Sequence, residues 1–182
     1  MDDAIFVRRY FGDCMRCHFC RDACCTHGVD VAVVERDRIL ARAGDLEPLV
    51  GVPRERWFLP AVVDDADFPG GQSTRTAILG GACVFHRRGA RGCLLHAVML
   101  DAGEDYHALK PMVSALFPVT FDDGALLCSN ELRDGSLVCA GEGPSAYEMA
   151  RGELGYYFGA ALVDELDAAA VRTARAHRSR SE

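Results

Sequence analysis

Cysteine is concentrated in one short stretch near the N-terminus. Five of the nine cysteines lie within twelve residues, in the order Cys14, Cys17, Cys20, Cys24 and Cys25. An isolated cysteine usually acts as a small buried hydrophobic side chain. Closely spaced thiols ionise together only if a cation lies among them, because thiolates without a metal repel one another. The spacing therefore predicts a metal-binding loop.

Two kinds of metal centre fit this loop. From Cys14 to Cys24 the sequence reads CxxCxxCxxxC, which is the cysteine spacing of bacterial iron–sulfur ferredoxins. Cys25 replaces the proline that usually follows, and the run is not repeated, so we do not expect a two-cluster ferredoxin. Zinc fits as well, because four soft ligands commonly come from one close pair and one distant pair. We favour iron slightly, since the ferredoxin-like spacing is the more selective signal.

Four cysteines outside the loop could complete such a site: Cys83, Cys93, Cys128 and Cys139. Residues 87–92 form a predicted turn that would bring Cys83 and Cys93 together, as in a ligand-bearing hairpin. Cys128 and Cys139 are explained equally well as buried core thiols.

Three histidines border the candidate ligands. His96 follows Cys93 at a spacing that allows ligation, but a histidine at the start of a helix more often caps or packs. His18 and His27 flank the loop and are better explained as hydrogen-bond partners of ligands than as ligands.

The chemistry of the thiols alone offers a weaker hypothesis. Adjacent Cys24 and Cys25 could form a reversible disulfide, but its small ring requires a strained peptide geometry. No CxxC lies within a thioredoxin-like βαβ pattern. The chain also has no glycine-rich phosphate loop, HExxH, GxSxG or Rossmann fingerprint, so no hydrolase or nucleotide-dependent enzyme is indicated. We name no catalytic residue.

These residues resemble a known family, the CxxCxxCC or YkgJ-like cysteine-cluster proteins, which are described as zinc- or iron-chelating. The resemblance covers roughly residues 10–120. It rests on the loop that ends in Cys24 and Cys25, on Cys83, on the Gly-Cys-Leu-Leu-His segment at 92–96 and on the segment 110–118. The resemblance implies chelation without naming a reaction.

One ligand of that family pattern is missing. Ser114 stands where the pattern has a cysteine, and Ala115 replaces a basic residue. Either Cys128 or Cys139 therefore substitutes for the missing ligand, or the site is smaller than in the family.

Length, composition and charge indicate the number of domains and the cellular location. A chain of 182 residues can bury a core without crosslinks, and we expect one domain over residues 1–170 followed by a flexible basic tail at 171–182. The acidic N-terminus resembles no export signal and no apolar run could span a bilayer, so we expect a cytoplasmic protein with free thiols and no membrane contact. The net charge of −7 argues against nucleic-acid binding.

The pattern of residues predicts a small, irregular α+β domain with short hairpins and a C-terminal helix. We expect an amphipathic helix over 31–43 that ends at Gly44, and hairpins joining 61–63 to 74–79 and 119–121 to 125–127. A helical turn is predicted between Pro111 and Pro118. Ser145 and Glu148 have the spacing of a capping box at the start of the last helix.

The function predicted from these features is binding of iron, as an iron–sulfur cluster or otherwise, or of zinc, with a redox or metal-delivery role. The alternative is a zinc-stapled module that binds a protein partner and has no chemistry of its own.

Overall fold

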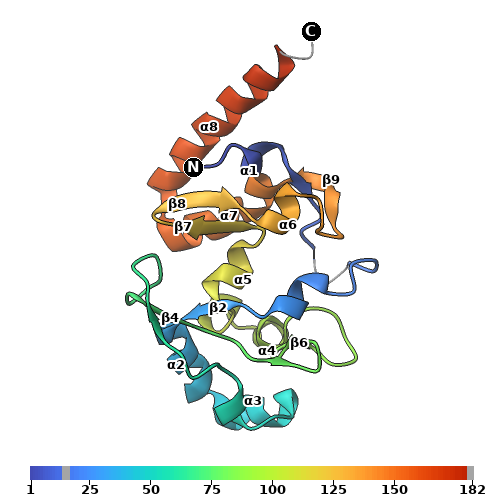
Figure 1. Ribbon diagram of the computed structural model, residues 1–182, viewed down its shortest axis with the longest axis vertical. Helices are drawn as coiled ribbons and strands as arrows, with labels where there is room; N and C mark the ends of the chain where they lie inside the picture. The colour runs from blue at the N-terminus through green and yellow to red at the C-terminus, as the bar shows by residue number, and fades with distance from the viewer. Residues whose placement is uncertain (14–16, 180–182) are drawn as a thin grey trace. The chain divides into compact units, whose positions relative to one another are not determined.

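The computed structural model describes residues 1–13 and 17–179, so Cys14 lies outside the described residues. The sequence predicted one domain over 1–170, whereas contacts divide the chain into two compact units. We call residues 13–115 the central unit, and residues 1–12 with 116–182 the terminal unit. Each unit combines helices with short antiparallel strands, so the predicted α+β class is confirmed (Figure 1). None of the described helices is long and apolar enough to cross a membrane.

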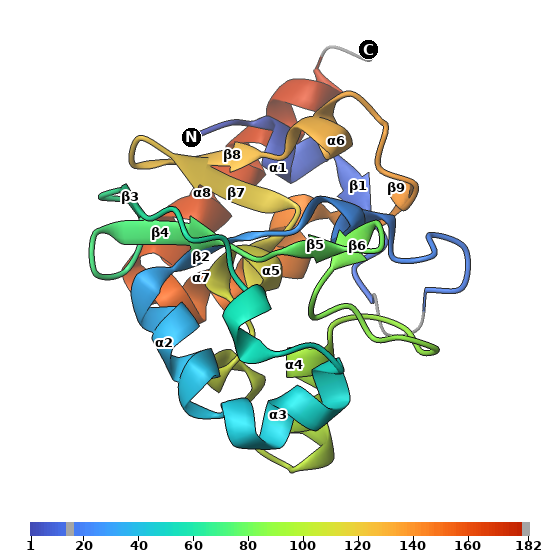
Figure 2. The ribbon, with the colours of Figure 1, turned by 60° about the horizontal axis from the view of Figure 1, so that its bottom comes forward.

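The central unit begins with the cysteine loop and ends at helix α5. It contains two small antiparallel sheets, with strand orders β2-β4-β3 and β5-β6 (Figure 2). Its elements are the 3-10 helix η1 (Ala23–His27), β2 (Asp30–Ala32), α2 (Val33–Ala41), α3 (Ala43–Val50), η2 (Arg54–Arg56), β3 (Val63–Asp64), β4 (Gln72–Arg75), β5 (Ile78–Leu79), β6 (Ala82–Cys83), α4 (Leu94–Asp101), η3 (Tyr106–Ala108) and α5 (Met112–Leu116).

The terminal unit joins the two ends of the chain. β1 near the N-terminus pairs with β9, and β7 pairs with β8. Its elements are α1 (Ala4–Val7), β1 (Arg9–Tyr10), β7 (Val119–Asp122), β8 (Ala125–Cys128), α6 (Asn130–Arg133), β9 (Ala140–Ser145), α7 (Ala146–Phe158) and α8 (Ala160–Arg178).

Both predicted hairpins are confirmed, with shifted bounds. In the first, β3 pairs with β4 so that Val63 lies opposite Ser73. In the second, β7 and β8 pair from Val119 opposite Cys128 to the turn. Asp123 and Gly124 at that turn both have positive φ, 48° and 67°. A two-residue turn of this kind matches the twist of the strands it joins.

The predicted helix over 31–43 is wrong at both ends. Val31 and Ala32 form β2, because their backbone pairs with Thr74 and Ser73 of β4. Gly44 does not end the helical segment, since α3 continues through it to Val50 and buries Leu46 and Val50. The left-handed residue that ends α3 is Gly51, with φ 69°.

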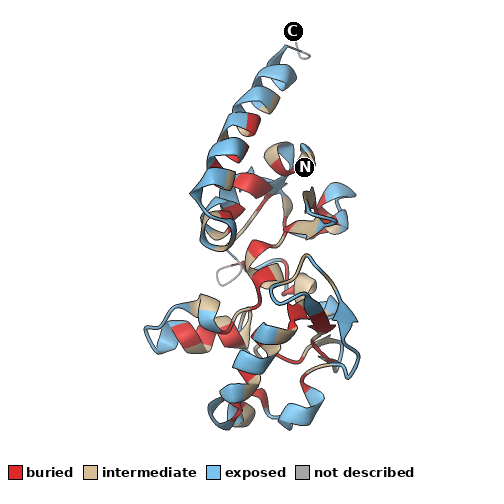
Figure 3. Cartoon of the chain, turned by 90° about the vertical axis from the view of Figure 1, so that its left-hand side faces the viewer, coloured by how far each residue is buried: buried red, intermediate tan, exposed pale blue. Residues whose placement is uncertain are grey.

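The C-terminal helix is interrupted. The capping box is confirmed: the Glu148 amide donates to the Ser145 hydroxyl at 3.2 Å, and the Ser145 amide donates to the Glu148 carboxylate at 2.7 Å. Gly159, with φ 86°, then separates α7 from α8. The helix α8 continues to Arg178, within the segment expected to be a flexible tail, and its last turns are largely exposed (Figure 3).

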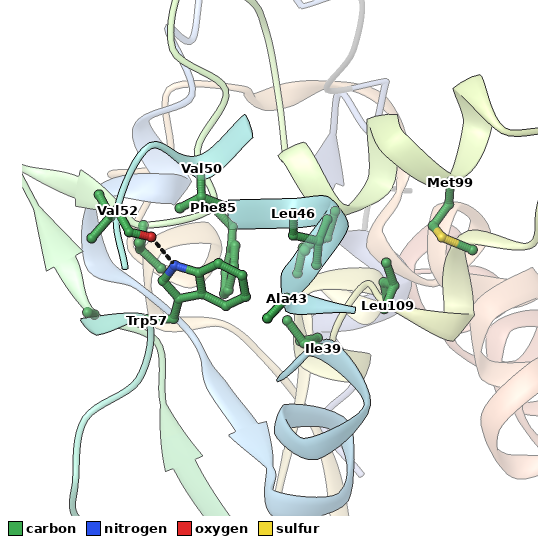
Figure 4. Packing of buried hydrophobic residues seen from close by; sticks show 12 residues of the cluster. Ile39, Ala43, Leu46, Val50, Val52, Trp57, Phe85, Met99 and Leu109 are labelled. Atoms are coloured by element: carbon green, nitrogen blue, oxygen red, sulfur yellow. Dashed lines mark hydrogen bonds between the residues drawn. The ribbon is translucent and has the colours of Figure 1, made fainter. Parts of the chain in front are cut away.

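The core of the central unit surrounds the only tryptophan of the chain, Trp57. Its side chain is fully buried, and its indole N–H donates to the Val52 carbonyl at 2.8 Å (Figure 4). The Phe85 ring meets it edge to face, at 5.4 Å between centroids. Because Phe85 lies between Cys83 and Cys93 in the sequence, this core supports the turn that carries both thiols.

A buried carboxylate ties two helices of the central unit together. Glu35 accepts from the Ala32 amide at 3.1 Å and from the Met112 amide at 2.9 Å. These amides lie at the N-terminal ends of α2 and α5, where helix N–H groups lack partners within the helix. Burial nevertheless raises the pKa of Glu35 above its ordinary value of 4.5, because the two amides and Arg38 compensate only part of the desolvation.

This raised pKa predicts a pH dependence of stability. The stability due to protonated Glu35 is fully present below pH 4.5 and is lost as pH rises through the folded-state pKa. Glu35→Gln is neutral throughout, so its free energy of unfolding relative to the wild type should rise across that window. Urea unfolding followed by circular dichroism at several pH values measures this difference. Glu55→Gln, at an exposed carboxylate, is the control, and an equal pH slope in both variants would contradict the prediction.

Candidate metal site

The first part of the described cysteine loop is a tight turn. Cys17 and Cys20 are 1 % and 7 % exposed, and the Cys20 amide donates to the Cys17 sulfur at 3.4 Å. Arg21 and Asp22 then adopt left-handed conformations, with φ 51° and 57°. Two consecutive non-glycine residues in this region are uncommon, and such strain persists only where surrounding contacts hold it. Immediately afterwards the chain enters η1.

The helix η1 carries Cys24 and Cys25, and it packs against β6, which ends at Cys83. The predicted turn after β6 is confirmed. The Arg87 amide donates to the Gly92 carbonyl at 3.0 Å, and His86 pairs with Cys93 across the turn. Cys93 therefore lies beside the strand end that bears Cys83, immediately before α4.

Four thiols of this region interact electrostatically. The pKa of Cys25 is raised, first by its hydrogen bond with the Cys24 thiol, then by burial and by the charges of Cys24, Cys93 and Cys83. The same hydrogen bond lowers the pKa of Cys24 to about 7, although burial and the Asp22 carboxylate oppose this. The structure thus brings Cys83 and Cys93 together with the second half of the cysteine loop.

The environment of Cys93 has opposing effects on its thiol. Burial raises its pKa, and the neighbouring Cys83 acts in the same direction. The amides of His96 and Leu95 at the start of α4 and the ammonium group of Lys110 act to lower it. These amides and the ammonium group favour the thiolate form, as the start of a helix does in general.

Cys17 and Cys20 form a second thiol pair. Burial raises the pKa of Cys20, and its hydrogen bond with Cys17 raises it further. For Cys17, burial is outweighed by that bond, by backbone amides and by the charge of Arg91, so its pKa is lowered. A proton shared between two thiols favours ionisation of one of them.

Three polar residues that the sequence did not single out contact one another beside Cys20: Asp22, His86 and Arg91. The buried Asp22 carboxylate contacts the His86 Nε2 at 3.1 Å and the Arg91 Nη2 at 3.4 Å. The same Arg91 Nη2 donates to the Cys20 sulfur at 3.2 Å. Asp22 therefore joins the cysteine loop to the turn between Cys83 and Cys93. The available sequence signal was a set of charged residues next to cysteines, in Cys-Arg-Asp and Arg-Gly-Cys.

Two of the predicted ligands belong to the terminal unit. Cys128 ends β8 opposite Val119, and Cys139 precedes β9. Both side chains are buried, and burial raises the pKa of Cys128. Ser114, where the resemblance to the cysteine-cluster proteins predicts a cysteine, lies in α5 of the central unit.

The candidate histidines have different surroundings. His18 and His27 are exposed. The His96 ring packs on Tyr106, with 4.3 Å between centroids, and Tyr106 also stacks on His107. His96 is thus part of an aromatic stack between α4 and η3.

The cysteines in the described part of the chain are free thiols. None of these eight cysteines forms a disulfide bond. Among the described residues, no three cysteine, histidine, aspartate or glutamate side chains are already arranged to hold a metal ion. The donor chemistry nevertheless suits a soft cation, because thiolates favour zinc and iron–sulfur centres. Binding would replace the protons that the thiols now share, as is usual when a metal enters a cysteine site.

Comparisons with protein-family models, with curated proteins and with solved structures found no match to this chain.

Proposed function

We propose that this protein binds a metal ion, as iron, including an iron–sulfur cluster, or as zinc, through cysteine thiolates of the central unit. The observation that supports the proposal most is that Cys25 of η1 interacts electrostatically with Cys83 and Cys93, which are 58 or more residues further along the chain, while η1 packs against the strand β6 that ends at Cys83. Cysteines that act only as small buried side chains do not need to lie close to one another.

The physical argument concerns charge. Each ionised thiol in this group raises the pKa of its neighbours, as for Cys25. A cation among the thiols reverses the sign of that interaction, so the thiolates that bind it become stable together. Two cations of the central unit compensate part of the remaining negative charge: Arg91 acts on Cys17 and Cys20, and Lys110 acts on Cys93.

The role of the site depends on the metal. Iron would allow electron transfer or delivery of a cluster, in keeping with the ferredoxin-like spacing. Zinc is redox-inactive and would staple the loop to the turn at 87–92, which leaves a module for binding a protein partner. The cysteine spacing still favours iron slightly.

Purification without oxygen tests the proposal and identifies the metal. We expect the protein to carry tightly bound iron or zinc by elemental analysis. A brown protein with sulfur-to-iron charge-transfer absorption and acid-labile sulfide would identify an iron–sulfur cluster, whereas a colourless protein with zinc would support the interaction module. Protein that stays metal-free, and binds neither added zinc nor a reconstituted cluster, would contradict the proposal.

A further inference from the structure

Arg91 contacts the cysteine loop at Cys20 and Asp22. It stands in the turn at 87–92, yet its side chain is only 29 % exposed. Its Nη2 is 3.2 Å from the Cys20 sulfur and 3.4 Å from an Asp22 carboxylate oxygen. Within the described part of the chain, its Nε is buried and has no hydrogen-bond partner.

Asp22 holds this guanidinium in place. The carboxylate is 5 % exposed, so it requires a positively charged or hydrogen-bonding partner. Its second oxygen contacts the His86 ring at 3.1 Å. The planar guanidinium can donate to the carboxylate and to a sulfur at the same time, which an ammonium group cannot do with the same geometry.

The charge of a thiolate site explains why a guanidinium is useful there. A divalent ion with four thiolates has a net charge of −2 by simple addition of formal charges, and burying it costs free energy unless nearby charges compensate it. N–H groups that donate to ligating sulfurs lower the electron density on those sulfurs, and such partners tune metal sites.

We propose that Arg91 is a positioning residue that donates to the metal-bearing thiolate of Cys20, is held by Asp22, and compensates the negative charge of the site. The inference rests on the proposed function, because it assigns a role only if Cys20 is a ligand. If the inference is correct, metal affinity depends on Arg91 as well as on the cysteine ligands.

Cobalt(II) is a suitable probe, because it occupies both zinc and iron sites and its sulfur-to-cobalt charge-transfer band reports on the sulfur ligands. The full-length protein, reduced and metal-free, is titrated as wild type, Arg91→Met, Arg91→Lys and Arg88→Met. Arg88 lies in the same turn and is exposed, which makes Arg88→Met the matched control. Circular dichroism verifies that each variant is folded.

We expect Arg91→Met to bind cobalt about 10–100-fold more weakly, as for loss of other residues that support metal ligands. Its charge-transfer band should move to lower energy, because the sulfur loses a hydrogen bond. Arg91→Lys should recover part of the affinity, and Arg88→Met should match the wild type.

Other outcomes would overturn the inference. Equal affinity and equal spectra for Arg91→Met and Arg88→Met would do so, as would weaker binding with an unshifted band, which indicates a packing role. If Arg91→Met does not fold, the neutral variant Arg91→Gln replaces it, and wild-type affinity with an unshifted band in that variant would overturn the inference. A wild-type protein that binds no cobalt would instead remove the proposed function, and this inference with it.

Discussion

Replacing Cys83 and Cys93 together by serine is expected to abolish metal binding while the protein remains folded. These residues supply the thiols that reach the cysteine loop from the turn at 87–92. If a four-thiolate site contributes about 10 kcal/mol, loss of two equal shares would weaken binding by about 5 kcal/mol, which is more than about a thousandfold in Kd. Metal content after purification, and the Kd for zinc or cobalt by competition with a chelator, measure this effect.

The matched control is Cys128→Ser with Cys139→Ser. It removes two other buried thiols, and both belong to the terminal unit. We expect its metal content to equal that of the wild type, because the site would then be smaller than the family resemblance predicts, with no substitute for the cysteine expected at Ser114. Loss of metal from this control alone would mean that Cys128 or Cys139 is a ligand. Full metal content in the Cys83 and Cys93 variant would show that the cysteine loop acts without them.

Trp57→Ala should cause a large loss of stability in the central unit. The indole is fully buried, contacts Phe85 and donates to the Val52 carbonyl. Truncation of a buried tryptophan typically costs about 3–5 kcal/mol, because it leaves a cavity and removes apolar contacts. That loss is a large part of the ~5–15 kcal/mol that stabilises a typical protein.

Urea unfolding in the presence of a chelator measures this loss, since bound metal would stabilise the folded state and hide it. Circular dichroism is the appropriate signal, because the substitution removes the only tryptophan. Leu59→Ala is the control, since the Leu59 side chain is 45 % exposed, and a change of about 0.5 kcal/mol or less is expected. Similar losses in both variants would contradict the assignment of Trp57 to the core.

The elements predicted correctly from the sequence are those whose determining interactions are local. The capping box joins Ser145 to Glu148 across one helical turn. The turn between β7 and β8 depends on the positive φ that Asp123 and Gly124 tolerate. In both places, residues within a few positions of one another determine the backbone conformation, and their types can be read directly.

The predicted bounds of the helix over 31–43 were wrong because contacts with distant segments determine the backbone conformation there. The sequence at 31–43 has helical spacing, but pairing with β4 draws Val31 and Ala32 into a strand. Gly44 is a weak helix former, yet burial of Leu46 and Val50 keeps the chain helical beyond it. Packing of this kind outweighs the cost of about 1 kcal/mol for a glycine within a helix.

For the candidate site, the donor chemistry could be predicted from the residue types alone. A run of closely spaced cysteines predicts thiolate ligation whatever the surrounding fold, because the reactivity of sulfur is a property of the residue. Which distant groups contact that run of cysteines could be learned only from the fold. Asp22, His86 and Arg91 acquire their significance from contacts across 64 and more residues, such as those of Asp22 with His86 and of Cys20 with Arg91. Contacts of this length depend on how the whole central unit packs, and residue types and local spacing do not encode that.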